Sequence, residues 1–453
     1  MNDLSRVRSD LAGIVWPPIS VGAKATLGQY LWQLERSQWL PAGEIAALQH
    51  AQLVALATHA ATHCEPFRAR LEEAALKPED LATPEGLRRL PVLGRRALQA
   101  AGARLYCAEV PEGHLPLTES RTSGSTGEPV VVRRTQVNRL DWMAMTVRDH
   151  FWHGRDVTKP ISVIRARNGA LRERPDWGLP MSLLFDTGPA QYIPITLDVA
   201  RQVELLRRFG PEHLLLYPSI LDAIARYCRT NDLTLNTVKH VWTMAESLTP
   251  AIREDAEETF GVKIEDTYSS EEVGVIAIQC PASGLYHAME HIIVEVRDAE
   301  GRPCADGEVG RMVVTDLHNW SMPIVRYDIG DYAEMAGTCS CGRGLPALRR
   351  IVGRERNLIV MPDGGRKWPL VSSSRFRRIA PIQQYQLIQH TREAIEVRLV
   401  AEATITADQE NRLRALIQDS LGHAFDLSFT YFDDEIPRAP GGKFEQFLCK
   451  VAP

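Results

Sequence analysis

The middle of the chain alternates helical and strand patterns, and this alternation constrains the fold most. Three short apolar runs have the length and burial pattern of strands: His213–Tyr217, His240–Met244 and Val262–Thr267. Helical patterns separate them, and the last of these helices has Thr249-Pro250 as its start signal and Gly261 as its stop signal. Strands and helices that alternate in this order predict a parallel sheet with crossover helices.

Other segments extend this α/β core. The first hundred or so residues are predicted to be mostly helical, and Ile292–Arg297 and Gly310–Thr315 have the pattern of an antiparallel pair. After Gly353 a strand, a helix and a strand predict a small α+β unit. We therefore expect an α/β fold in two domains. Residues 1–353 form the large domain, with a helical leader at about 1–100, and residues 354–453 form a small C-terminal domain.

Composition excludes several classes of protein. The 453 residues carry 52 basic and 57 acidic side chains, a net charge of −5, which does not favour binding to nucleic acid through bulk charge. No apolar run is long enough to span a membrane, and the first residues lack a signal-peptide pattern. Eight cysteines are too few for a disulfide scaffold. The expected location is the cytoplasm.

The strongest local motif is the segment TSGSTGEP at residues 122–129. Its two glycines allow backbone N–H groups to turn toward an anion, and its hydroxyl side chains add donors. Val130-Val131-Val132 and the residues before the motif predict a hairpin around it. The Gly-Lys-Ser/Thr ending of a P-loop is absent, and a polar surface turn is the alternative interpretation.

Three further motifs follow in order along the chain. Asp266–Gly274 places carboxylates after a predicted buried strand, where ligands of open α/β folds collect and where Mg²⁺ finds oxygen ligands. Arg326–Asp331 places a carboxylate at a turn, and Pro437–Phe444 places a lysine in a glycine-containing loop. Each motif has an alternative interpretation when it is taken singly. Asp266–Gly274 also fits a solvated acidic pair that caps a helix, Arg326–Asp331 an ordinary Gly-Asp turn, and Pro437–Phe444 a loop with a solvated lysine.

In their order and spacing the four motifs resemble the adenylate-forming superfamily, and within it the phenylacetate–CoA ligase family. The resemblance runs from about Leu31 to Lys443 and includes the opening LERSQWL at residues 34–40. It implies ATP, Mg²⁺ and a carboxylic acid as reaction partners, with CoA as the acceptor.

The resemblance also implies a role for individual residues. The loop that holds the ATP phosphates would comprise Ser123, Gly124, Ser125, Thr126 and Gly127. Residues beside the adenine, the ribose and the α-phosphate would be Ala245, Glu246, Asp266, Thr267, Tyr268 and Ser269. Glu272 would bind Mg²⁺, Asp331 the ribose, Arg354 would lie at the hinge between the domains, and Lys443 would serve the adenylation step.

The chemistry explains these residue types. A carboxylate oxygen attacks the α-phosphorus of ATP and expels pyrophosphate, and both reactants are anionic. Mg²⁺ and Lys443 would offset charge that builds in the transition state. A thiol or an amine then attacks the acyl-adenylate. Family members rotate the small domain between the two half-reactions, which would remove Lys443 from the site.

Some positions depart from the family pattern. Glu128 stands where many relatives carry lysine, and Arg356 stands where aspartate is common. The segment DGGRKW at 363–368 differs from the second-step loop of CoA ligases. The acceptor therefore stays open between CoA, an amine and a carrier-protein thiol, with CoA as the first choice.

Four residues predict a metal site. Cys339 and Cys341 form a Cys-x-Cys pair, and Cys280 and His287 follow the Glu272 motif. Together they match a tetrahedral Cys₃His zinc site without an open ligand position, which would be structural. Some phenylacetate–CoA ligase relatives are similar at these positions. Four ordinary reduced side chains are the alternative.

The remaining alternative is a nucleotide-binding or zinc-stabilised interaction protein without activity. Glu272, Asp331 and Lys443 occur together, which favours the enzyme. A homodimer is compatible with the family, and the acid is not identified by the sequence.

Overall fold

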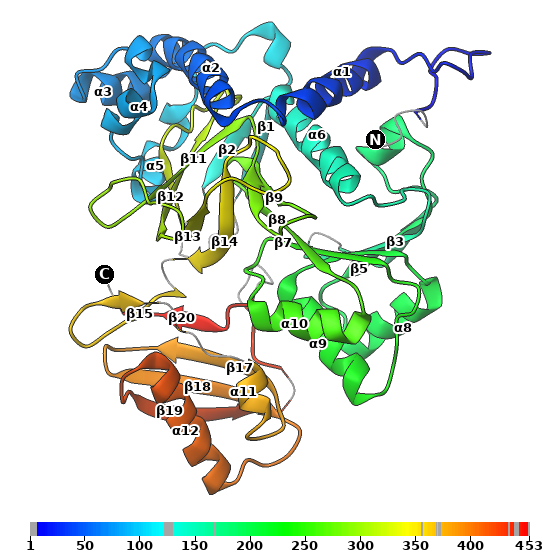
Figure 1. Cartoon of the computed structure of the whole chain (residues 1–453), viewed down its shortest axis with the longest axis vertical. Coiled ribbons are helices and arrows are strands. Elements are labelled where there is room, and N and C mark those ends of the chain that lie inside the picture. The colour runs from blue at the N-terminus through cyan, green and yellow to red at the C-terminus, as the bar shows by residue number, and fades with distance from the viewer. Residues whose placement is uncertain are drawn as a thin grey trace.

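The computed structural model describes residues 7–121, 130–166, 169–354, 357–367, 369, 373–433, 435–438 and 444–451. Helices from the N-terminal part lie at the top of the view in Figure 1, a large sheet lies below them, and the C-terminal unit lies at the bottom. We use "C-terminal unit" for residues 373–451. The predicted α/β class, with a large mixed sheet and a small α+β C-terminal part, is confirmed.

The predicted helical leader is present. Its helices are α1 (Gly22–Ser37), α2 (Ala42–His63), α3 (Glu65–Glu73), α4 (Pro84–Arg89) and α5 (Arg95–Ala101). The apolar side chains of α2 at Leu53 and Leu56 are fully buried and belong to one core cluster with residues of the antiparallel strands. The leader is therefore packed onto the sheet by apolar burial.

One sheet in the described chain contains twelve strands, in the order β11-β12-β13-β14-β10-β9-β8-β7-β6-β3-β5-β4. Its first half along the chain comprises β3 (Ile161–Arg165), β4 (Arg172–Arg174), β5 (Ala190–Pro194), β6 (His213–Leu216), β7 (His240–Met244) and β8 (Ile264–Ser270). The pairs β5–β3, β3–β6, β6–β7 and β7–β8 are parallel. The parallel arrangement of β6, β7 and β8 was predicted, whereas the strands β3 and β5 were not. The strand expected at Val262–Thr267 begins two residues later and extends to Ser270.

Helices beside this half of the sheet are α6 (Gln136–Trp152), α7 (Met181–Leu184), α8 (Val199–Phe209), α9 (Pro218–Thr230) and α10 (Pro250–Phe260). The predicted start and stop signals act as expected in α10. The Thr249 hydroxyl accepts from the Ile252 N–H, and Gly261 ends the helix with φ +68°. That left-handed conformation is unfavourable for residues with a Cβ, so glycine suits the position.

The second half of the large sheet is mostly antiparallel. Its strands are β9 (Gly274–Gln279), β10 (Tyr286–Ala288), β11 (Ile292–Arg297), β12 (Val309–Asp316), β13 (Tyr327–Ala336) and β14 (Ala347–Arg354). The predicted β11–β12 pair is antiparallel, with Ile292 opposite Asp316. β1 (Thr118–Arg121) and β2 (Val131–Arg134) form a separate antiparallel pair, as predicted for the segments on either side of the motif. The motif itself, at 122–129, lies outside the described residues.

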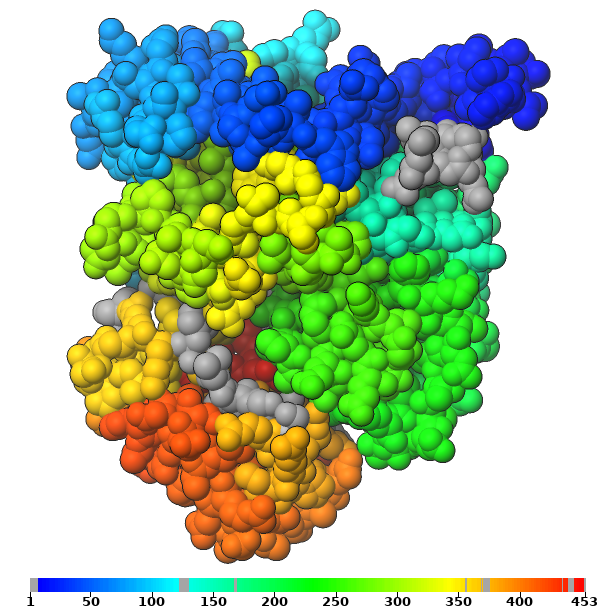
Figure 2. All heavy atoms as spheres, viewed as in Figure 1, coloured from blue at the N-terminus to red at the C-terminus, as the bar shows by residue number. Residues whose placement is uncertain are grey.

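The C-terminal unit has a four-stranded sheet in the order β19-β18-β17-β20. Its elements are α11 (Ser373–Arg377), β17 (Ile382–Gln389), β18 (Ala394–Ala401), α12 (Ala407–Leu421), β19 (Asp426–Phe432) and β20 (Phe447–Cys449). A short pair, β15 (Ile359–Val360) and β16 (Arg366–Lys367), precedes it. The orange surface of this unit adjoins the green surface around α9 and α10 (Figure 2). Among the described helices, none is long and apolar enough to cross a membrane.

Candidate active site

The parallel strands β7 and β8 bring two predicted segments together. Met244, the last residue of β7, lies opposite Thr267 of β8. Ala245 and Glu246 follow β7, while Tyr268 and Ser269 continue β8. Parallel neighbours end at the same edge of a sheet, so both segments lie at the carboxyl edge, where open α/β folds bind ligands.

Tyr268, Asp331 and Arg354 form the centre of the site. The Tyr268 hydroxyl donates to Oδ2 of Asp331 at 2.5 Å, and the Arg354 Nε lies 3.3 Å from Oδ1. The register of β13 and β14 places Asp331 opposite Arg354. Burial raises the pKa of Tyr268 well above its ordinary value, and the neighbouring Asp331 carboxylate raises it further. Three residues distant in sequence therefore share one polar cluster.

Glu272 is held beside this cluster by the helical leader. Only 6% of its surface is exposed, and Oε1 lies 3.1 Å from Nη1 of Arg95 at the start of α5. The Ser270 hydroxyl accepts from the Glu272 N–H at 3.2 Å and fixes the turn after β8. The carboxylate is therefore buried and ion-paired. Arg95 was not predicted from the sequence, because an arginine on a helical leader belongs to no motif.

Glu246 faces the C-terminal unit. Its Oε1 accepts from the Phe444 N–H at 3.1 Å, and its Oε2 accepts from the Ser219 N–H at 3.0 Å. Burial raises the pKa of Glu246, and the bonds from Ser219 and Phe444 oppose that shift. Phe444 directly follows Lys443 in the sequence, and Lys443 itself lies outside the described residues, as do Ser123 to Gly127.

Asp266 and Thr267 make their contacts inside the protein. The Asp266 carboxylate accepts from the Thr243 hydroxyl at 2.6 Å and from the Tyr286 hydroxyl at 2.8 Å. Burial raises the pKa of Asp266 to about 6. The Thr267 hydroxyl donates to Asp149 of α6 at 3.4 Å. The structure therefore brings Tyr268, Asp331 and Arg354 together in one cluster, while the Asp266 carboxylate bonds to other partners.

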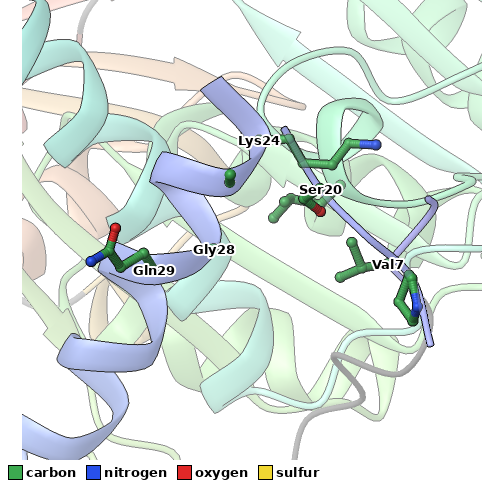
Figure 3. A pocket seen from close by; sticks show the side chains of 8 residues that line it. Val7, Ser20, Lys24, Gly28 and Gln29 are labelled. Atoms are coloured by element: carbon green, nitrogen blue, oxygen red, sulfur yellow. The ribbon is translucent and has the colours of Figure 1, made fainter. Parts of the chain in front are cut away.

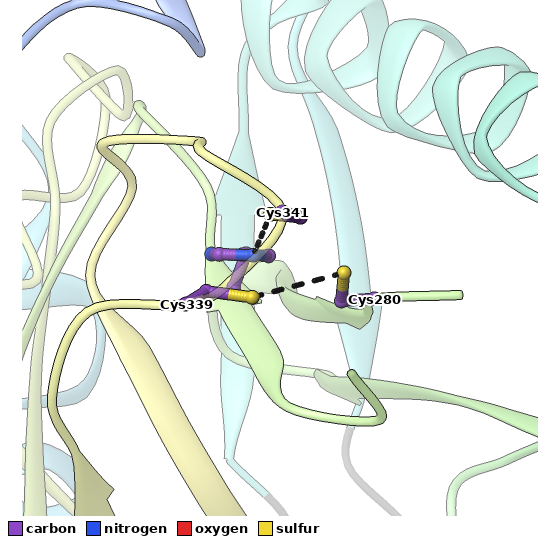
Figure 4. Close-up of side chains that lie close together, drawn as sticks. Cys280, Cys339 and Cys341 are labelled. Atoms are coloured by element: carbon purple, nitrogen blue, oxygen red, sulfur yellow. Dashed lines mark hydrogen bonds between the residues drawn. The ribbon is translucent and has the colours of Figure 1, made fainter. Parts of the chain in front are cut away.

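A second cluster comprises the four predicted metal ligands. One ligand atom from each of Cys280, His287, Cys339 and Cys341 lies within 4.8 Å of the others. The sulfurs of Cys280 and Cys339 are 3.9 Å apart, and Nε2 of His287 lies 3.3 Å from the Cys341 sulfur (Figure 4). Nδ1 of His287 lies 3.2 Å from the Leu345 carbonyl, which leaves Nε2 for the cluster. Three thiols and one imidazole match the donor set of a tetrahedral metal site.

A surface pocket lies away from both clusters. It is lined by the segment around Val7 and Ser20 and by α1 residues Lys24, Gly28 and Gln29 (Figure 3). Lys24 is engaged there, because its Nζ donates to Asp10 at 2.5 Å and to the Arg8 carbonyl at 3.1 Å. None of the described residues predicted for the nucleotide site lines this pocket.

The fold and the polar cluster at the carboxyl edge define an adenylate-forming enzyme fold. The model of the AMP-binding enzyme family matches residues 40–319, more than half of the chain, and that of the CapK C-terminal domain matches residues 362–449. The chain belongs to the AMP-binding enzyme family. The resemblance predicted from the motifs is thereby confirmed.

Relatives and solved structures agree with this assignment. A phenylacetate–coenzyme A ligase of Thermus thermophilus is 26% identical over 90% of this chain and 97% of its own. One of Escherichia coli is 24% identical over 88% and 93%. A crystal structure of 2-hydroxyisobutyryl-CoA ligase in the postadenylation state superimposes with a TM-score of 0.72, at 20% identity and 92% coverage of both chains. This last likeness confirms the fold.

Proposed function

We propose that the protein activates a carboxylic acid with ATP, releases pyrophosphate, and transfers the acyl group from the acyl-adenylate to CoA. The single observation that carries the proposal is the convergence of Tyr268, Asp331 and Arg354 at the carboxyl edge of the parallel strands. Family membership and relatives named as CoA ligases along nearly the full chain support it.

Each residue has a proposed part in the reaction. Asp331 accepts hydrogen bonds from the ribose hydroxyls, and Ala245, Thr267, Tyr268 and Ser269 line the adenine and α-phosphate. The backbone of residues 123–127 holds the ATP phosphates. Lys443 offsets charge on the α-phosphate in the transition state.

Glu272 is the proposed Mg²⁺ ligand. It offers hard carboxylate oxygens on a buried side chain, which suits this ion. The bound ion would neutralise phosphate charge during pyrophosphate release. Arg95, 3.1 Å from Oε1, would hold the carboxylate in place for that role.

CoA is the proposed acceptor, since relatives named as CoA ligases cover most of the chain. The segment at residues 363–368 differs from the second-step loop of CoA ligases, so an amine or a carrier-protein thiol is the second candidate for the acceptor. Ordinary turnover with free CoA as the only acceptor would exclude that candidate.

The Cys₃His cluster is proposed to hold a structural zinc ion. The donor set and the mutual approach of its ligand atoms within 4.8 Å support zinc. The ion would tie the loop after β9 to the loop after β13. We further propose that the chain divides at 353/354, with Arg354 at the hinge, so that the small domain moves between half-reactions.

Acid-dependent ATP–pyrophosphate exchange across a panel of carboxylic acids tests the proposal before any acceptor is added. We expect exchange with one class of acid, and a loss of about a hundredfold or more in Lys443→Ala, because one transition-state charge contact is removed. Lys450→Ala, at an exposed lysine seven residues later in the sequence, is the matched control and should keep wild-type exchange. Exchange at the wild-type rate in Lys443→Ala would refute the assignment.

A further inference from the structure

Polar contacts among the described residues join the C-terminal unit to the large domain, and three of them carry the argument. Arg377 of α11 pairs with Asp255 of α10. Nη1 of Arg438 donates to the Ser219 hydroxyl at 2.8 Å. The Phe444 N–H donates to Glu246 at 3.1 Å. All three partners on the large sheet belong to α9, α10 or the turn after β7.

Glu246 directly follows Ala245, a residue proposed to line the adenine. Each of its carboxylate oxygens accepts one backbone N–H, from Phe444 on the C-terminal unit and from Ser219 on α9. Ser219 is the second residue of α9, so the carboxylate also lies at the positive end of that helix. A carboxylate suits this position because it has an acceptor oxygen for each partner and a charge that the helix end favours.

The backbone before Glu246 has an uncommon conformation. Ala245 has φ +68°, a left-handed value that is rare in residues with a Cβ and that concentrates at functional sites. Ala245 directly follows β7, and Glu246 is the next residue. The left-handed residue Ala245 therefore links strand β7 of the proposed nucleotide site to Glu246, which contacts the C-terminal unit.

We propose that Glu246 is a positioning residue, which holds the C-terminal unit in the orientation for adenylation by binding the backbone one residue after Lys443. The inference rests on the proposed function and deepens it. It assigns Glu246 to the contact between the two parts of the chain, in place of the direct adenine or ribose contact implied by family resemblance. The transfer half-reaction, for which the C-terminal unit moves, does not need this contact.

A purely structural role makes different predictions. If Glu246 only capped α9, its loss would lower stability and affect both half-reactions alike. If Glu246 only contacted ATP, its loss would raise the KM for ATP with little change in kcat. A positioning role predicts a lower kcat for adenylation, a nearly unchanged KM for ATP, and unimpaired transfer.

The test is Glu246→Gln, assayed in the two half-reactions separately. Glutamine keeps an acceptor oxygen at one of the two positions and places an NH2 donor at the other, so the present pair of bonds to Phe444 and Ser219 is not kept. We expect kcat for exchange to fall about tenfold, the loss typical of a hydrogen bond to a charged group. Transfer from a supplied acyl-adenylate should keep its wild-type rate, and hydrogen exchange of the Phe444 amide should become faster.

Two further variants sharpen the test. Asp255→Asn weakens a contact on α10 that belongs to the same attachment, and it should also slow adenylation selectively. Glu258→Gln, at an exposed carboxylate of α10, is the matched control and should leave both half-reactions unchanged.

Equal slowing of both half-reactions, or a change confined to the KM for ATP, would overturn the positioning role. Failure of the proposed function gives a different result. The wild-type protein would then show no acid-dependent exchange, whereas the Phe444 amide would still report whether Glu246 holds the C-terminal unit.

Discussion

His213, the first residue of β6, is fully buried and makes one hydrogen bond through its ring. Its Nε2 lies 2.8 Å from the Asp156 carbonyl, while its Nδ1 has no hydrogen-bond partner among the described residues. Burial is the main cause that lowers the pKa of His213 to about 4, and the nearby His240 and Arg155 lower it further. A second ring proton would therefore be buried without an acceptor.

The pH dependence of stability follows from this shift. The folded pKa of about 4 lies below the ordinary value of 6.5, so the unfolded chain binds more protons between these values. The contribution of His213 to the free energy of unfolding should fall by about 2.5 kcal/mol from about pH 7.5 to about pH 4.5. Urea unfolding of the wild-type protein and of His213→Gln at both pH values measures this fall. The variant has no titrating side chain at position 213, so its free energy of unfolding should not show the fall due to His213. A stability difference that does not change with pH would contradict the prediction.

The site residues differ in how far the sequence could predict them. Tyr268, Asp331 and Arg354 belong to motifs whose order is visible in the sequence, but Asp331 was expected at a turn and lies inside β13. The pairing of β13 with β14 brings Asp331 to Arg354, and no local pattern places Tyr268 beside them. Arg95 pairs with Glu272 across 177 positions of sequence, and no local pattern connects the two. The contact of Asp266 with Tyr286 was equally unpredictable, because the pairing of β8 and β10 with β9 brings the two together. Thr243 meets Asp266 because the two residues lie opposite each other in the β7–β8 pair.

At the scale of elements, local signals predicted the helix boundaries well. The predicted signals Thr249 and Gly261 begin and end α10, where Thr249 accepts from a backbone N–H and Gly261 is left-handed. Asp198 and Gly210 act in the same way at the two ends of α8. These signals act within a few residues of the backbone they satisfy. The end of β8 was predicted less well, since its last residues are stabilised by pairing with β9 rather than by their own pattern.

Thr249→Ala tests the helix-cap contribution in α10. In the wild-type protein the Thr249 Oγ1 accepts from the Ile252 N–H at 3.3 Å. The variant lacks this acceptor, so its free energy of unfolding should be about 1 kcal/mol lower. Thr249→Ser keeps the hydroxyl and should retain most of the stability. Denaturant midpoints of the three proteins measure the effect, and equal losses in both variants would show that the hydroxyl is not the cause.

At the scale of the whole molecule, the Cys₃His cluster is joined to the helices. Arg343 follows Cys341 by two residues, and its guanidinium lies 4.8 Å from the Trp39 ring centroid and 4.1 Å from that of Trp152. The Arg343 Nε also donates to Gln38 at 2.7 Å. The cluster therefore connects the antiparallel strands to the end of α1 and to α6.

Because Arg343 contacts Trp39 and Trp152, loss of the proposed zinc ion should change the tryptophan fluorescence. Wild-type protein is expected to contain about one zinc ion per chain, and Cys341→Ser should lose most of it with a change in tryptophan fluorescence. Cys304→Ser, at a buried cysteine outside the cluster, should keep the metal. Metal analysis and fluorescence spectra test both variants, and equal zinc content in Cys341→Ser and wild type would contradict the proposal.

The sequence by itself determined the α/β class, the order of strands and helices, and the residue types of the site. These features depend on local periodicity, on caps and on motifs that span a few residues. The tertiary structure decided which distant groups meet: Arg95 with Glu272, Tyr268 with Asp331, and Glu246 with Phe444. Such contacts depend on how strands pair and helices pack across hundreds of residues, and burial then determines which charges must be paired.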